Sequence, residues 1–308
     1  MKAGKAFEIL VQQILLCVGF SQVPVDGMYI IDKPAVGLMI QGLAEAHNAD
    51  VLLEPPVQTP FYSRTRLLIE CKDHIRKVGL NTIRSALGLR EDVNHFNIVD
   101  IKELIARRNQ KRNCLTYNFD RYTYQIAVAS MSGFSIQGQN FAAAYRIPLI
   151  EFNKMPFWED FCKKSGFSLK KTLSQVEISE DEIIRTAKQI GSRMAIAITN
   201  SGQILFLYRV KGTLSQFGDH YSLHWRSVDS PWILRSADQE YLFQLPDDIM
   251  RNWLENTKTE LDKKRSAIDC KERSLSNMVV YYREQGLPTI KMISIDQGQL
   301  AEARSRFR

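Results

Sequence analysis

The stretch Arg66-Leu67-Leu68-Ile69-Glu70-Cys71-Lys72 is an apolar run that ends abruptly in Glu-x-Lys. Successive apolar residues are typical of a strand covered on both faces, which predicts a central place in a sheet. Side chains alternate along a strand, so Glu70 and Lys72 share one side and Cys71 takes the other. Two charges at the end of a buried strand are costly unless they pair or hold an ion. The stretch therefore predicts a sheet with a polar site at its edge.

A second acidic residue precedes this strand, in Asn48-Ala49-Asp50-Val51-Leu52-Leu53. Magnesium prefers hard oxygen ligands, usually one or two carboxylates with waters and a substrate phosphate. The ion polarises the phosphate and lowers the pKa of a bound water. A lysine beside it can orient or deprotonate that water, or neutralise charge that develops on the phosphate. Asp50, Glu70 and Lys72 are therefore the predicted catalytic group, with Mg²⁺ as cofactor and Mn²⁺ as a substitute.

The spacing of Asp50 and Glu70-Cys71-Lys72 resembles the signature of the PD-(D/E)XK nuclease superfamily. The segment Gly4-Lys5-Ala6-Phe7-Glu8 resembles its first helix, whose glutamate often joins the metal site. The segments 128–135, 140–142 and 147–150 resemble the closing strand, helix and strand of Mrr-like restriction endonucleases. Three features depart from the pattern. Ala49 stands before Asp50 in place of proline, Glu45-Ala46-His47-Asn48 stands where the Mrr-like branch often has glycines, and Glu70 stands where that branch often has glutamine.

This resemblance covers about residues 1 to 155 and implies a three-layer α/β fold, a restriction-endonuclease-like core with a mixed central sheet. It implies metal-dependent cleavage of phosphodiester bonds in double-stranded DNA, with restriction or defence as the expected context and a homodimer as the expected assembly. The implied catalytic residues are Asp50, Glu70, Lys72 and Glu8. The implied metal ligands are Asp50, Glu70 and the backbone carbonyl of Cys71.

The order of elements agrees with an α/β layer arrangement that closes near Phe152. Apolar residues at spacings of three and four predict a helix over Lys2–Val18, ended by Gly19. The other predicted elements are strands at Gly27–Ile31, Val36–Ile40, Ala49–Leu53, Tyr124–Ser130 and Pro148–Phe152, and helices at Leu80–Val93, Ile101–Asn113 and Phe141–Tyr145.

Composition changes from about Lys163, where lysines flank a Gly-Phe-Ser element typical of a linker. We therefore predict a nuclease domain over residues 1–160, soluble without the rest, and a C-terminal α+β domain over 170–308 for DNA recognition or oligomerisation. Its predicted elements are a helix capped by Ser179, a hairpin of Met194–Thr199 and Gln203–Val210, further strands at Tyr221–Ser227, Glu240–Gln244, Met278–Tyr282 and Thr289–Ile295, and one helix over Asp247–Lys264.

Bulk properties restrict the classes of protein. The 308 residues carry a net charge of +7, which favours a polyanionic partner without proving one. The five cysteines are scattered and never form CxxC, which argues against a disulfide framework and a structural zinc site. No apolar run approaches the roughly 20 residues of a bilayer span. A cytoplasmic protein without membrane contact is expected.

Ordinary roles compete with the catalytic ones. Glu70 and Lys72 would also suit a surface ion pair on an edge strand, Asp50 a turn after Asn48, and Glu8 a solvent-facing helix position. The histidines His47 and His74 flank the acidic motifs without zinc-site spacing. The basic run Lys102–Arg112 suits a solvated helix face as well as phosphate contacts, and the aromatic residues Trp225, Trp232, Tyr241 and Phe243 suit a core better than base stacking.

Two other functions stay open at this point. One is a nuclease of DNA repair or recombination, and the other is a non-catalytic DNA-binding protein on a nuclease fold. The intact Asp50, Glu70 and Lys72 weigh against the second.

Overall fold

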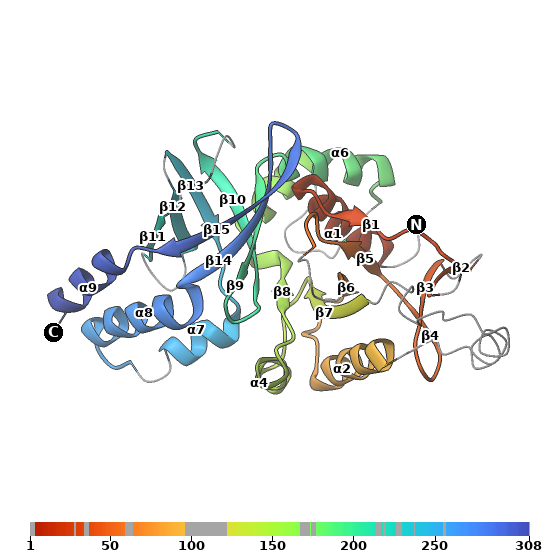
Figure 1. Cartoon of the computed structure of the whole chain (residues 1–308), viewed down its shortest axis with the longest axis horizontal. Helices are drawn as coiled ribbons and strands as arrows, with labels where there is room; N and C mark the ends of the chain where they lie inside the picture. Colours follow the sequence, from red (N-terminus) through yellow and green to blue (C-terminus); the bar gives the residue numbers. More distant parts are fainter. Residues whose placement is uncertain are drawn as a thin grey trace, which may run out of the picture.

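The computed structural model describes residues 4–27, 29–33, 37–58, 64–95, 122–166, 173, 177–213, 217, 220–225, 230–236, 238–254 and 257–307. The fold is mixed α/β, with a five-stranded sheet, a three-stranded sheet and a closed barrel (Figure 1). The predicted helix Ile101–Asn113, including Lys102–Arg112, lies outside the described residues.

The five-stranded sheet has the order β1-β5-β6-β7-β8. Strand β5 pairs with β6 in antiparallel fashion, whereas β6, β7 and β8 run parallel. The predicted central position of the Glu-x-Lys strand is confirmed, because β6 is the middle strand of the five. The bounds are β1 (Ser21–Gln22), β5 (Val51–Glu54), β6 (Arg64–Lys72), β7 (Tyr122–Ser130) and β8 (Leu149–Glu151).

Helices cover both faces of this sheet, as Figure 1 shows. Helix α1 (Lys5–Val18) lies on one face, and α2 (Leu80–His95) and α4 (Ile136–Tyr145) lie on the other. The alternation along β6 fits this arrangement, because Leu67 and Ile69 belong to the hydrophobic cluster of α1 and Leu68 to that of α2. The end of α1 is predicted correctly: Gly19 adopts the left-handed conformation, with φ 118°.

The three-stranded sheet consists of β2 (Ile30–Lys33), β3 (Gly37–Gln41) and β4 (Ala46–Asn48), paired in antiparallel fashion. Strand β4 ends two residues before Asp50, and β5 begins one residue after it. Asp50 therefore lies at the junction between the two sheets.

Several predicted boundaries need correction. Helix α4 begins at Ile136 instead of Phe141, because the Ser135 hydroxyl accepts the N–H of Gly138 at 3.1 Å and caps it. The single helix predicted over Asp247–Lys264 is two helices, α7 (Asp247–Leu254) and α8 (Glu260–Leu275). The lysines predicted to open a linker, Lys163 and Lys164, belong to α5 (Trp158–Ser165), which follows a short 3-10 turn η2 (Phe152–Lys154).

The C-terminal half forms the closed barrel, in the order β10-β13-β12-β11-β15-β14-β9. Its core residues include Trp232, Tyr241 and Phe243, all fully buried, which confirms their predicted role in packing. The bounds are β9 (Met194–Thr199), β10 (Ile204–Lys211), β11 (His220–His224), β12 (Trp232–Ser236), β13 (Gln239–Phe243), β14 (Asn277–Glu284), β15 (Leu287–Ile295) and the final helix α9 (Gln297–Arg306).

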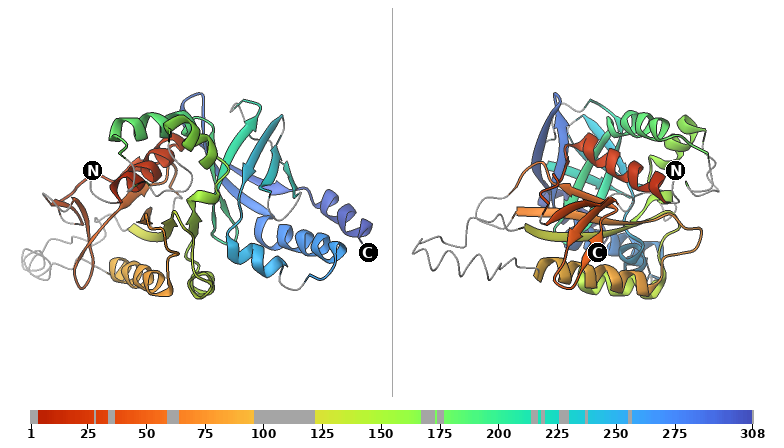
Figure 2. Two further views of the ribbon diagram at one scale, coloured as in Figure 1. Left: turned by 180° about the vertical axis from the view of Figure 1, so that it is seen from behind. Right: turned by 90° about the vertical axis from the view of Figure 1, so that its right-hand side faces the viewer.

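One hydrophobic cluster extends from the first half of the chain into the second. Helix α6 (Glu180–Gly191) lies beside α1, as both views in Figure 2 show, and its Ile183 and Ile190 are buried in the cluster that contains α1. The approach requires Gly191, because a Cβ there would lie 2.5 Å from the Cβ of Cys17. The division into residues 1–160 and 170–308 stays a prediction, and the core is continuous across it.

Among the helices of the described ranges, none combines the length and hydrophobicity that crossing a bilayer demands.

Candidate active site

The pairing of β5 with β6 brings Asp50 beside Glu70. Val51 faces Ile69 and Leu52 faces Leu68, so continuing the register by one residue places Asp50 opposite Glu70. The backbone N–H of Cys71 donates to Oδ2 of Asp50 at 2.8 Å, and the side-chain amide of Asn48 donates to Oδ1 at 3.1 Å. Asp50 is therefore anchored to the end of β6, a tie that a simple turn residue would not need.

Glu70 and Lys72 form an ion pair along β6, between Oε1 and Nζ. Their side chains are 23% and 25% exposed, so both are largely covered but still reach solvent. The shared side agrees with strand alternation. An edge-strand surface pair is not what the structure shows, since β6 is central.

Helix α1 brings Glu8 to the same region. Its side chain is 19% exposed, and its Oε2 lies 2.8 Å from Nζ of Lys5. The negative charge of Glu8 is one of the smaller causes that raise the pKa of Asp50. Glu8 is thus more covered than a solvent-facing helix residue.

The charges of this cluster oppose the ionisation of Asp50. Burial is the largest cause that raises the pKa of Asp50, and the neighbouring charge of Glu70 is the next. The hydrogen bond from Cys71 and the charge of Lys72 lower it, but the pKa still stands at about 6. A bound cation would relieve this repulsion.

The pKa values of Lys72 and Cys71 are both raised in this environment. Burial lowers the pKa of Lys72, but its hydrogen bond to Glu70 and the charges of Glu70 and Asp50 outweigh burial, and the pKa is raised. Lys72 is therefore an ammonium ion at neutral pH. Burial and the nearby carboxylates raise the pKa of the Cys71 thiol well above its ordinary value, so this thiol is unreactive.

The donor set suits a hard cation, since carboxylate oxygens are what Mg²⁺ prefers. Within the described ranges, no three His, Cys, Asp or Glu side chains converge as they would around a bound ion. The reason is local, because Glu70 is turned to Lys72 and Glu8 to Lys5. Each lysine takes the place of a cation beside its carboxylate. The predicted ligands Asp50, Glu70 and the Cys71 carbonyl remain a prediction.

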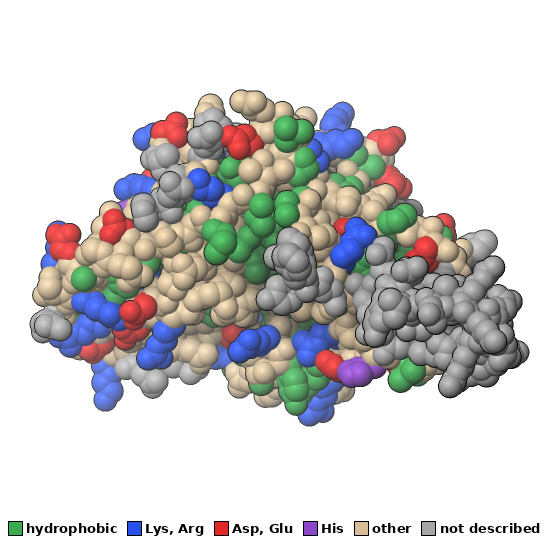
Figure 3. Space-filling view, in the orientation of Figure 1, with side chains coloured by type: hydrophobic (Ala, Val, Ile, Leu, Met, Phe, Trp, Pro, Cys, Tyr) green, Lys and Arg blue, Asp and Glu red, His purple; other side chains and the backbone are tan. Residues whose placement is uncertain are grey.

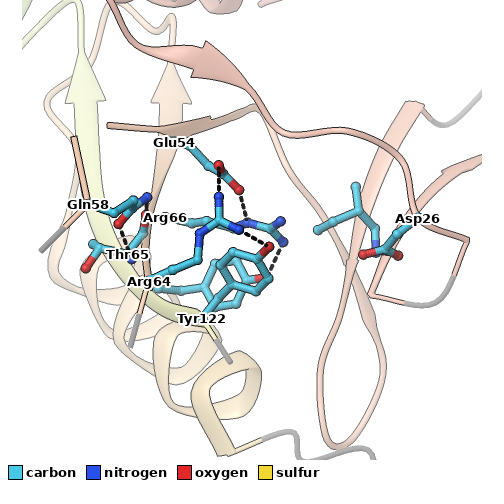
Figure 4. A network of polar contacts seen from close by, with 9 residues as sticks. Asp26, Glu54, Gln58, Arg64, Thr65, Arg66 and Tyr122 are labelled. Atoms are coloured by element: carbon cyan, nitrogen blue, oxygen red, sulfur yellow. Dashed lines mark hydrogen bonds and ion pairs between the residues drawn. The ribbon is translucent and has the colours of Figure 1, made fainter. Parts of the chain in front are cut away.

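The opposite end of β6 shows how this chain satisfies a buried charge. Arg66 is 2% exposed, donates to Glu54 Oε1 at 2.9 Å and to the Tyr124 hydroxyl at 3.0 Å, and lies 3.3 Å from the ring centre of Tyr122 (Figure 4). Arg64 donates to the other oxygen of Glu54 at 3.1 Å. The two cations share the carboxylate of Glu54, and Asp26 lies in the same network (Figure 4). At the candidate site, the charges of Glu70 and Glu8 instead add to the causes that raise the pKa of Asp50.

His47 does not enter the site. Its Nε2 lies 2.6 Å from Oδ2 of Asp92 on α2, and Oδ1 of Asp92 accepts the N–H of Ala44 at 3.0 Å. The hydrogen bond from His47 is the main cause that lowers the pKa of Asp92. The pair fixes the turn between β3 and β4, where a Cβ at Gly42 would lie 2.0 Å from Oδ2 of Asp92.

The structure adds residues at the carboxyl edge of the sheet that were missed in the sequence. Ser130 lies beside Lys72, and Glu151 lies beside Ser130 in the next strand. Glu151 lies 3.2 Å from Lys154, which also contacts Asp247 at 2.7 Å. Burial, followed by the charge of Asp247, raises the pKa of Glu151. Ser130 ends β7 and Glu151 ends β8, and this position at or next to the end of a predicted strand could have indicated them.

Comparison with known proteins gives no relative: no family model matches this chain, and neither does a curated protein or a solved structure.

Proposed function

We propose that this chain is a magnesium-dependent endonuclease that hydrolyses phosphodiester bonds in double-stranded DNA. The observation that carries the proposal is Asp50, bonded to the end of the central strand β6 beside the ion pair of Glu70 and Lys72. In open α/β sheets, ligands bind outside the carboxyl ends of strands, which is where β6 ends.

The proposal includes a restriction-endonuclease-like core made of the five-stranded sheet between α1 and the pair α2 and α4. Its support is the placement of the motif residues: the first helix, the Asp50 strand, the Glu-x-Lys strand and the closing strand, helix and strand follow in the expected order. The barrel is no part of such a core, although residues of its strands β9 and β10 pack in the same hydrophobic cluster as α1.

Each side chain has a defined role in this proposal. Asp50, Glu70 and the Cys71 carbonyl would hold Mg²⁺, which supplies polarisation of the phosphate and a water of lowered pKa. Lys72 would stabilise negative charge that develops on the phosphate. Glu8 completes the acidic side of the site from α1.

A plasmid cleavage assay tests the proposal. The full-length protein should cut DNA with Mg²⁺ and not with chelator, and Glu70→Gln should abolish cutting. Glu159→Gln is a matched control, because Glu159 is 65% exposed on α5 and remote in sequence from the motif. Binding without cleavage would instead favour a non-catalytic DNA-binding protein.

Restriction or defence is the proposed context, with the barrel as the recognition or oligomerisation unit. Cleavage confined to a sequence or a modified base supports this context, whereas preference for branched or damaged DNA supports repair or recombination.

A homodimer is part of the proposal. Hydrophobic side chains gather over the β14–β15 hairpin in Figure 3, where Ile290 and Met292 are 37% and 73% exposed. Light scattering of wild type and Met292→Lys measures the assembly.

A further inference from the structure

The four residues His74, Ile75, Arg76 and Lys77, which we name the basic loop, follow the candidate site and all have exposed side chains. Ile75 is 70% exposed, among the highest values for a large hydrophobic residue in the described part of the chain. An isoleucine held in water contributes nothing to folding through burial. Single exposed apolar side chains are common on protein surfaces, so what singles out Ile75 is its basic neighbours and the place of the loop beside the candidate site.

The backbone around the basic loop is fixed, although its side chains are exposed. Asp73 before it is buried. The hydroxyl of Ser132 donates to the carbonyl of Arg76 at 2.6 Å, and the N–H of Val78 donates to the carbonyl of Gly133 at 2.8 Å. A surface that is ordered before binding loses less entropy when a ligand arrives. The loop thus presents Ile75 in a set position.

The basic loop borders the candidate active site. It begins two residues after Lys72, and the loop that follows β7 packs against it through the bridge between Val78 and Phe134. The N–H of Met131 donates to the carbonyl of Lys72 at 3.2 Å, so both loops lie at the carboxyl edge of the sheet. Ile75 therefore lies in a loop at the edge of the sheet where Lys72 ends β6.

Within the described ranges, Arg76 and Lys77 form no ion pair with an acidic side chain, in contrast to Lys72, Lys5 and Lys154. The charge of Lys77 acts on Glu151, whose pKa it lowers. Phosphate groups are the natural partners of such cations in a protein that binds DNA. An apolar side chain between them matches the wedge by which some proteins unstack a base step and kink a duplex.

We propose that the basic loop docks on duplex DNA beside the scissile phosphate, with Arg76 and Lys77 on the phosphates and Ile75 inserted at a base step. This inference rests on the proposed function and adds that the substrate is bound in an unstacked form. Phosphate contacts alone would not require Ile75.

The test measures unwinding in chelator, where no strand is cut. A closed circular plasmid is relaxed by a metal-independent topoisomerase in the presence of the full-length protein, and its linking number is read after deproteinisation. Wild type should leave a linking deficit that grows with bound protein. Ile75→Ala should lose most of this deficit while DNA affinity stays within a few-fold. Ile136→Ala, which truncates an isoleucine that is 59% exposed on α4, should behave as wild type.

The cations are tested by affinity. Replacing both Arg76 and Lys77 by glutamine should weaken DNA binding and reduce the slope of log affinity against log salt by about two. Unchanged melting of each variant shows that folding is intact, as expected for exposed positions.

The outcomes separate this inference from the proposed function. An equal deficit with wild type and Ile75→Ala, no deficit with wild type, or no binding to the duplex overturns the wedge. Unwinding that depends on Ile75 in a protein that never cuts with Mg²⁺ supports the wedge and overturns catalysis. Cleavage with Mg²⁺, together with a linking deficit that is the same in wild type and Ile75→Ala, supports catalysis and overturns the wedge.

Discussion

The backbone N–H of Cys71 donates a 2.8 Å hydrogen bond to Oδ2 of Asp50. This bond ties Asp50 to the strand that carries Glu70, and it favours the ionised form of Asp50. Burial and the charge of Glu70 outweigh it and leave the pKa of Asp50 at about 6. Two strands therefore hold a carboxylate in surroundings that disfavour its charge.

Without metal, the contribution of Asp50 to stability should fall as pH rises. Its pKa is near 3.8 in the unfolded chain and about 6 in the folded protein, so the folded protein binds the proton more tightly. The stabilisation is present in full below the lower value and is lost above the higher one. Asp50→Asn carries no charge and should remove this step. Thermal melts in chelator across this pH range measure it, and identical pH profiles for both proteins would show that the step does not come from Asp50.

Magnesium should reverse the destabilisation at pH above about 6, because a cation binds the ionised carboxylate. A ligand at a hundred times its Kd stabilises by about 2.7 kcal/mol. The melting temperature of wild type should therefore rise with Mg²⁺ at pH 8 and change little at pH 5. Asp50→Asn should show little response at either pH, and Glu159→Gln should respond as wild type. A magnesium response that survives in Asp50→Asn would place the ion elsewhere.

Lys72→Ala should separate catalysis from binding. Charge stabilisation in a transition state is worth roughly 3 to 4 kcal/mol, which corresponds to about a hundred- to a thousand-fold in rate. Single-turnover cleavage should fall by that factor while DNA affinity, measured with calcium, stays within a few-fold. Near-normal cleavage would remove the catalytic role of Lys72. A large loss of affinity with a normal rate at saturating enzyme would make Lys72 a DNA anchor.

Glu8→Gln should both weaken cleavage and shift its pH profile. The charge of Glu8 raises the pKa of Asp50, so its removal should move the acidic limb of the profile to lower pH. Loss of a carboxylate from the acidic side of the site should also lower the rate at every pH. Lys5→Met is the matched control, because it removes the ion pair at 2.8 Å and leaves the carboxylate in place. Unchanged rate and profile in Glu8→Gln would return this residue to an ordinary helix position.

Ile190→Ala should destabilise both halves of the chain together. Ile190 is fully buried in the cluster that also contains α1, and truncation of such a residue costs about 2 to 5 kcal/mol. One unfolding transition should shift, seen equally by tryptophan fluorescence, to which Trp158 of α5 and three tryptophans of the second half contribute, and by DNA cleavage from the candidate site. For the same reason, a fragment that ends near residue 167 should expose α1 and aggregate. Two separate transitions would show independent domains.

The central sheet was predictable because its signals are local. The apolar run of β6 and the glycine at position 19 are such signals. The strand and the helix end that they predict agree with the structure. Other elements lack such signals. The strand Trp232–Ser236 was missed, and the continuous polar pattern after Asp247 concealed the end of α7, although Thr259 is an N-cap that marks the start of α8.

The candidate site was predictable as a grouping and not as a geometry. Strand alternation and an antiparallel neighbour suffice to bring Asp50, Glu70 and Lys72 together. The turn of Glu70 toward Lys72 depends on side-chain rotamers, which the pattern of residues does not specify. The contact of Lys154 with Asp247 joins residues 93 positions apart in the sequence, and no local pattern predicts it.

Helix α1 is completed by the last strands of the barrel. The guanidinium of Arg283 donates to the carbonyl of Cys17 at 3.0 Å, across 266 residues of chain. On a ribosome that adds roughly 5 to 20 residues per second, roughly 15 to 50 seconds separate the emergence of the two residues. The helix that carries Glu8 therefore cannot form these contacts until Arg283 has been made. In the proposed nuclease, the candidate site would stay incompletely supported throughout that interval.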